Sequence, residues 1–149
     1  MAIDVTARIV IERPRAEVAA YVVDNRNDPT WIGGISESEL LGKGPVVEGS
    51  HVRRVASFLG KRIEYVNEVV RLEPATALEM RSVKSPIPMR VTYAFADAPG
   101  GTEASVRVQG EPGGLYRAGG PLMKRAVQRS IDRDVATLKR ILESGGAGR

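Results

Sequence analysis

Apolar and polar residues alternate along most of the chain before Gly110, a pattern typical of strands with one buried face. The first alternation spans Ile3 to Ile11. Turn-forming residues separate further predicted strands at 36–41, 51–59, 62–72, 77–83, 89–96 and 102–109. Between the first two strands, Pro14 favours a short helix over 15–23, and Asp28-Pro29 favours a helical turn that carries Trp31.

The hydrophobic period changes after Gly110. Apolar residues then recur at three- and four-residue steps, which predicts one amphipathic helix, most clearly over 121–143. We interpret the glycine-rich stretch 110–121 as a lid leading into this helix, with Leu115 and Tyr116 able to cover a ligand; the alternative is a flexible connection with no gating role. The order of elements predicts one α+β domain over 1–144, followed by a disordered glycine-rich tail over 145–149.

The turns between strands predict which side chains share a face of the sheet, because a one-residue slip would reverse every side chain. Centring the first hairpin on Gly60-Lys61 pairs Arg54 with Asn67, and the next turn pairs Asn67 with Ser82. These three residues form a predicted polar spot on an otherwise apolar, concave face. The apolar members of that face are Val52, Phe58, Ile63, Tyr65, Val69, Leu78, Met80, Met89, Val91, Tyr93, Phe95, Val106 and Val108.

Composition restricts the chemistry. The 149 residues include no cysteine and one histidine, His51, so a disulfide framework, a thiol nucleophile and a cysteine or multi-histidine metal site are excluded. The predicted register puts His51 on the outer face near a strand end, where we expect it to be exposed. We therefore predict no metal and no cofactor, and the predicted face has no evident group for proton transfer.

The net charge of +4 equals the excess of basic residues between Leu115 and Glu143. Arg125, Arg129 and Arg133 follow one another at four-residue steps and form a basic stripe, which we interpret as a solvated helix face. Nucleic-acid binding is not expected, because it would bring more basic residues and stacking aromatics. Contact with an anionic membrane is an alternative that we do not favour. The N-terminus has no signal-peptide pattern and no apolar run is long enough to span a bilayer, so we expect a cytoplasmic monomer or homodimer.

Several segments together resemble the polyketide cyclase/dehydrase-like branch of the START-like (SRPBCC) superfamily. The resemblance rests on the order and spacing of turns and packing positions at 14–18, 28–31, 49–55, 58–65, 68–70, 73–74, 86–89, 101–102 and 134–143. It implies a helix-grip fold, in which a bent antiparallel sheet of about seven strands wraps around a long C-terminal helix. Two short helices would follow the first strand.

The resemblance also implies a function, namely binding of a hydrophobic small molecule such as a lipid or polyketide between the sheet and the last helix. The alternatives are a polyketide cyclase/aromatase or dehydratase, in which Arg54, Tyr65 or Tyr93 orients the substrate, and a protein- or membrane-interaction module that uses the basic helix. No catalytic residue follows from the resemblance. The candidate ligand-binding residues are Trp31, Arg54, Phe58, Tyr65, Asn67, Met80, Ser82, Met89, Tyr93, Leu115, Leu122 and Met123.

Each candidate has a structural alternative. Arg54, Asn67 and Ser82 either bind a ligand oxygen or form a structural polar cluster. Tyr65 and Tyr93 either polarise a ligand carbonyl or, as we favour, serve as wall residues. Trp31 either closes the cavity mouth or fills the core beneath the short helices.

Overall fold

The computed structural model describes residues 3–58, 60–85, 88–110 and 114–144, apart from the side chains of 58 and 114–120. The predicted tail over 145–149 therefore lies outside the described residues. The elements are β1 (Ile3–Ile11), α1 (Arg15–Val23), the 3-10 helix η1 (Asn25–Asn27), α2 (Asp28–Trp31), β2 (Ile35–Leu41), β3 (His51–Phe58), β4 (Lys61–Glu73), β5 (Ala77–Lys84), β6 (Met89–Ala98), β7 (Gly101–Gly110) and α3 (Gly114–Glu143).

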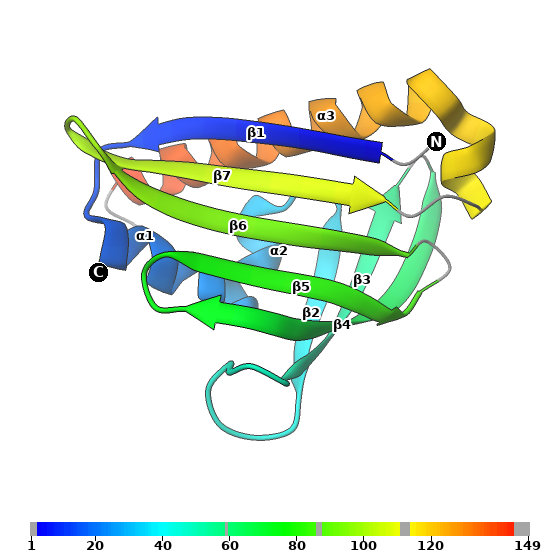
Figure 1. Ribbon diagram of the computed structural model, residues 1–149, viewed down its shortest axis with the longest axis horizontal. Helices are drawn as coiled ribbons and strands as arrows, with labels where there is room; N and C mark the ends of the chain where they lie inside the picture. The colour runs from blue at the N-terminus through cyan, green and yellow to red at the C-terminus, as the bar shows by residue number, and fades with distance from the viewer. Residues whose placement is uncertain (1–2, 59, 86–87, 111–113, 145–149) are drawn as a thin grey trace.

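The seven strands form one antiparallel sheet in the order β1-β7-β6-β5-β4-β3-β2. Each strand from β2 to β7 pairs with its neighbour in the chain, and β1 pairs with β7. The sheet is strongly bent, so that β2 and β3 run steeply across the direction of β1, β7 and β6 (Figure 1). Helix α3 runs along the length of β1 (Figure 1). Helix α1 packs against β6 and β7, and α2 packs against β2 and α3. This is the predicted helix-grip architecture, with its two short helices after the first strand.

The core lies between the concave face of the sheet and α3. In β1, Ile3, Val5, Ala7 and Ile11 are buried, as the alternation predicted. On α3, the buried apolar side chains recur at helical spacing and meet the sheet. They are Met123, Val127, Ile131, Val135, Leu138 and Leu142.

Most of the predicted register is confirmed. Asn67 pairs with Ser82, Leu78 with Tyr93 and Met80 with Val91. The first hairpin is the exception, because Arg54 pairs with Tyr65 instead of Asn67. The pairing is shifted by two residues, since Lys61 pairs with Phe58 and begins β4 instead of belonging to the turn. Gly60 remains in the turn with φ of 80°, a conformation that favours glycine. A shift of two leaves every side chain on its predicted face.

The start of the last helix also differs from the prediction. Helix α3 begins at Gly114, so 114–120 is helical and not a loop, and Pro121 lies inside the helix. Sequence reasoning placed Pro121 in the first turn because proline has no amide hydrogen; inside the helix it costs one backbone hydrogen bond. The side chains of Leu115 and Tyr116 are outside the description, and their predicted covering role remains a prediction.

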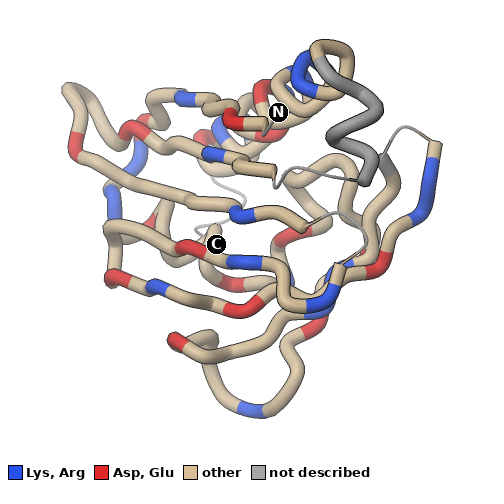
Figure 2. Tube along the Cα trace, turned by 45° about the vertical axis from the view of Figure 1, so that its right-hand side comes forward, with Lys and Arg blue, Asp and Glu red and all other residues tan. Residues whose placement is uncertain are grey.

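Charged residues of both signs are distributed along the strands and hairpin ends (Figure 2). Cross-strand ion pairs such as Arg53–Glu64, at 2.8 Å, and Arg107–Asp4, at 2.6 Å, lie on the exposed face. Pairs of this kind contribute little to stability. The three arginines of the basic stripe, Arg125, Arg129 and Arg133, are exposed, as predicted. His51 is also exposed, as predicted.

Candidate functional site

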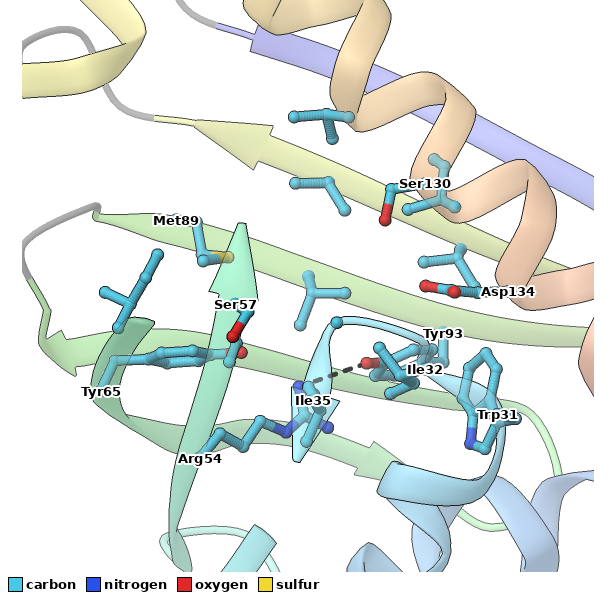
Figure 3. A pocket seen from close by; sticks show the side chains of 18 residues that line it. Trp31, Ile32, Ile35, Arg54, Ser57, Tyr65, Met89, Tyr93, Ser130 and Asp134 are labelled. Atoms are coloured by element: carbon cyan, nitrogen blue, oxygen red, sulfur yellow. Dashed lines mark hydrogen bonds between the residues drawn. The ribbon is translucent and has the colours of Figure 1, made fainter. Parts of the chain in front are cut away.

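A cavity of about 150 Å³ lies between the concave face of the sheet and α3 (Figure 3). Its wall is largely apolar. Ser57 is exposed and Gly34 and Ser130 are half-buried, so these residues form the rim. The lining residues are Trp31, Ile32, Gly34, Ile35, Arg54, Ala56, Ser57, Ile63, Tyr65, Met89, Val91, Tyr93, Val106, Val108, Val127, Ser130, Ile131 and Asp134.

Arg54 provides a buried positive charge at one end of the cavity. It is 4% exposed and comes from β3, which turns its side chain toward the concave face. Its Nη2 and Nε lie 3.0 and 3.1 Å from Oδ2 of Asp28, at the start of α2. The same oxygen accepts a 2.7 Å hydrogen bond from Ser38 Oγ on β2. The guanidinium charge is thus balanced by a carboxylate that is itself 1% exposed.

Tyr93 extends this polar cluster into the cavity. Arg54 Nη1 donates to Tyr93 Oη over 3.4 Å, the contact drawn in Figure 3. Burial raises the pKa of Tyr93 to about 12, although the nearby Arg54 acts in the opposite direction, so the phenol stays neutral. Burial would lower the pKa of Arg54, but Tyr93 and Asp28 outweigh that effect and hold it well above its ordinary value. The cluster therefore offers neutral and charge-assisted hydrogen-bond donors to a ligand oxygen.

Two aromatic side chains complete this end of the wall. Trp31, in α2, meets Tyr93 edge to face, with ring centroids 5.8 Å apart and planes at 68°. Trp31 is 2% exposed, so it is a buried wall residue and not a surface flap. Its Nε1 has no hydrogen-bond partner among the described residues. The hydroxyl of Tyr65 likewise makes no hydrogen bond with a described residue, and it lines the cavity.

Asp134 lies on the opposite wall, on α3. Its carboxylate points toward the cavity from one helical turn beyond Ser130 (Figure 3). Burial raises the pKa of Asp134 to about 6, despite a backbone hydrogen bond from Gly33 and the charge of Arg133, both of which lower it. An acid of this pKa exchanges protons near neutrality, so the cavity does contain a group suited to proton transfer.

The turn between α2 and β2 joins the two walls at the rim. Gly33 N–H donates to Asp134 Oδ1 on α3 over 2.9 Å. The next residue, Gly34, accepts a 2.8 Å hydrogen bond from Ser57 N–H on β3. A Cβ on Gly34 would lie 3.1 Å from the Ser57 carbonyl oxygen, so glycine permits this close approach.

Family comparison agrees with this architecture. The family model described as polyketide cyclase/dehydrase and lipid transport matches residues 2–143. The chain belongs to this family. No curated protein sequence matches the chain.

Solved structures similar to this polyketide cyclase/dehydrase and lipid transport family member show the shared fold. The aromatase/cyclase Zhui from a Streptomyces strain has a TM-score of 0.81 at 14% identity, covering 97% of this chain and 96% of its own. A START superfamily protein from Mycobacterium smegmatis has a TM-score of 0.78 at 14% identity, covering 95% and 97%. A major latex-like protein from Panax ginseng has a TM-score of 0.70 at 11% identity, covering 97% of both chains.

Five of the predicted site residues of this family member line the cavity together: Trp31, Arg54, Tyr65, Met89 and Tyr93. Four others lie elsewhere. Met80 lines a separate space of about 10 Å³ behind Arg54, and Met123 is buried in the core. Leu122 is 73% exposed, and Ser82 Oγ is bound to the backbone of Met89. The side chains of Phe58 and Leu115 are outside the description.

Asn67 is on the predicted face but does not line the cavity. It is 1% exposed, and neither its Oδ1 nor its Nδ2 has a hydrogen-bond partner among the described residues. The predicted cluster of Arg54, Asn67 and Ser82 is therefore divided. Arg54 belongs to the cavity, and Ser82 fixes the start of β6.

Sequence reasoning missed two carboxylates of the site. Asp134 occurs at helical spacing within the buried series Val127, Ile131 and Leu138, and a charge on the apolar face of a helix is a usable signal. Asp28 gave no such signal, because an aspartate at the start of a helical turn is normally a solvated residue. Only the bend of the sheet brings Arg54 beside it.

Within the described ranges, no group of three or more His, Cys, Asp or Glu side chains is placed to hold a metal ion. In the same part of the chain, no helix is long and apolar enough to cross a membrane.

Proposed function

We propose that this protein binds a small hydrophobic molecule in the cavity between the sheet and α3. The observation that carries the proposal is an apolar cavity with one buried, charge-balanced polar cluster at its end. Binding pockets for small molecules combine these features, since apolar walls supply affinity and a few polar groups fix orientation. Family membership supports the same function.

The polar cluster is suited to a ligand oxygen. Tyr93 Oη accepts from Arg54, so its own hydrogen is available to a ligand acceptor. The Tyr65 hydroxyl lines the same space and provides a second donor. A ketone, ester or phenol oxygen at this end would satisfy groups that otherwise lack a partner.

The size of the cavity sets the size of the bound group. An engineered cavity of roughly 150 Å³ in another protein holds one benzene ring. The cavity here, also about 150 Å³, therefore accommodates a ring-sized group, with any remaining part of the ligand at the rim near Ser57 and Ser130.

Native mass spectrometry and solvent extraction of the purified protein test this proposal directly. A co-purified organic molecule is expected, and it should be lost when Ala56, which lines the cavity, is changed to Phe to fill the space. Ala96→Phe, at an exposed position of β6, is the matched control and should retain the ligand. The proposal fails if neither a co-purified ligand nor an added aromatic ketone binds, or if both variants bind equally well.

A second candidate function is catalysis of the cyclase or dehydratase type, and Asp134 favours it. A carboxyl group with a pKa of about 6 that faces the cavity is suited to general acid–base chemistry. Arg54 and Tyr93 would hold the substrate carbonyl at the other end. Product formation from poly-β-ketone substrates by the parent protein, and its loss in Asp134→Asn, would establish this function; equal turnover by the variant would exclude this role for Asp134.

A further inference from the structure

The charges around the cavity do not balance. Two lining side chains carry a formal charge at neutral pH, Arg54 and Asp134. Tyr93 and Tyr65 add only hydroxyl groups to the wall. The cavity's charge therefore depends on how each of these two groups is compensated.

Arg54 is fully compensated before any ligand binds. Asp28 lies within 3.1 Å of both Nε and Nη2, on the side of the guanidinium away from the ligand space, and is as deeply buried as Arg54. A ligand anion would thus meet an arginine whose charge is already neutralised. It would gain a hydrogen bond from Nη1 or from Tyr93, but little net attraction.

Asp134 is not compensated in the same way. Gly33 N–H donates to Oδ1, and no described side chain donates to the carboxylate or forms an ion pair with it. The neighbouring Arg133 lies on the same helix but is exposed, so water screens its charge. When Asp134 is ionised, the cavity and its bordering residues sum to one negative charge.

We propose that the cavity selects ligands without negative charge, with a hydrogen-bond acceptor at the Arg54–Tyr93 end and a hydroxyl donor at the Asp134 end. This inference rests on the proposed binding function and narrows it to a ligand class. Hydroxy-ketones fit, whereas fatty acids and other carboxylates are rejected. A carboxylate in the cavity would lie in a low-dielectric space with ionised Asp134 and without a free counter-charge.

The test compares two probes that differ in charge and little else, 3-hydroxyacetophenone and 3-hydroxybenzoate. Their affinities are measured at pH 7.5 by calorimetry, or by chemical-shift titration where binding is weak. We expect the ketone to bind at least tenfold more tightly to the parent protein. Asp134→Asn keeps the acceptor for Gly33 but removes the charge, and it should reduce this ratio below threefold. Asp132→Asn, an exposed neighbour on the same helix, is the matched control and should leave the ratio unchanged.

Each outcome is informative. Equal or tighter binding of the carboxylate by the parent protein overturns the charge selection but leaves the binding function intact. A ratio that persists in Asp134→Asn overturns the role given to Asp134. If neither probe binds and no organic molecule co-purifies with the protein, the proposed function itself fails. Because the parent comparison needs no substitution, the first result does not depend on whether a variant folds.

Discussion

Arg54 and Asp28 form a buried ion pair that links β3 to α2, with 3.0 Å between Nη2 and Oδ2. Their side chains are 5% and 1% exposed. The contact joins two segments 26 residues apart and defines the polar end of the cavity. Any change to one partner therefore affects both folding and the site.

Removal of one member of this pair should be much more harmful than removal of both. Asp28→Asn leaves a buried guanidinium without its counter-ion and is expected to lower the free energy of unfolding by about 3 kcal/mol. The double variant Asp28→Asn, Arg54→Met should recover most of this loss. Urea denaturation measures the free energy of unfolding of the single and the double variant. Asp97→Asn, at an exposed position, is the control for the loss of a carboxylate. Equal stability of the single and double variants would contradict the prediction.

Asp134 should make stability depend on pH in an unusual direction. Its pKa is about 6 in the folded protein and 3.8 in its reference state, so the folded protein retains a proton that the unfolded chain releases between these values. Stability from this group is therefore greatest below pH 4 and decreases as pH rises to about 6.

The variant Asp134→Asn isolates this contribution. Relative to the parent protein, its free energy of unfolding should increase by on the order of 2 kcal/mol between pH 4 and pH 7. Urea titrations across that range measure the difference in the free energy of unfolding between the variant and the parent protein. The contributions of the other carboxylates cancel in this difference. A difference that is constant with pH would show that Asp134 has an ordinary pKa.

Tyr93→Phe should weaken ligand binding more than folding. The ring still packs against Trp31, but the hydroxyl that accepts from Arg54 is lost. We expect an affinity for an aromatic ketone that is about tenfold lower, since one buried hydrogen bond contributes about 1 kcal/mol or somewhat more. Tyr21→Phe, which removes an exposed hydroxyl bound to Thr30, provides the control. Unchanged affinity in Tyr93→Phe would show that the ligand oxygen lies elsewhere.

The packing of α3 against the sheet can be tested by making the same substitution, leucine to alanine, at one buried and one exposed position of the helix. Leu138 is 1% exposed and Leu122 is 73% exposed. Leu138→Ala should cost about 2–5 kcal/mol because it leaves a cavity in the core, whereas Leu122→Ala should stay within about 0.5 kcal/mol. Thermal and urea denaturation provide the comparison. Similar losses for the two variants would contradict the packing described for α3.

Strand periodicity and turn residues predicted the elements and most of the strand register, whereas the helix-grip arrangement followed from the family resemblance. Each strand carried its own alternation, and turns such as Pro99-Gly100 set the register of β6 and β7 without reference to the rest of the chain. The two-residue error in the first hairpin arose because the sequence allows Gly60 on either side of the turn. Local signals of this kind cannot distinguish pairings that leave the same faces buried.

The site was less predictable because it depends on contacts between distant segments. Arg54, Tyr65 and Tyr93 were found from the face they share, since that face follows from the register, and Trp31 was found from its place in the helical turn beside Gly33-Gly34. Whether each of these side chains lines the cavity or packs against a neighbouring side chain depends on how the sheet bends over α3. For this reason Asp28 was missed, and Ser82 was expected in the cavity although the backbone of Met89 occupies its hydroxyl.

The Gly33-Gly34 turn connects the two walls of the cavity through two amide hydrogens. The Gly33 and Ser57 amides are each held by a single hydrogen bond across the rim, one to the helix wall and one to the turn from the sheet wall. Because Gly33 and Gly34 are neighbours in the chain, an opening of this turn would break the contact with the helix wall and the contact with the sheet wall in one movement. Under conditions in which exchange follows every opening, the deuterium uptake of the two amides would then proceed at one common rate, the opening rate of the turn.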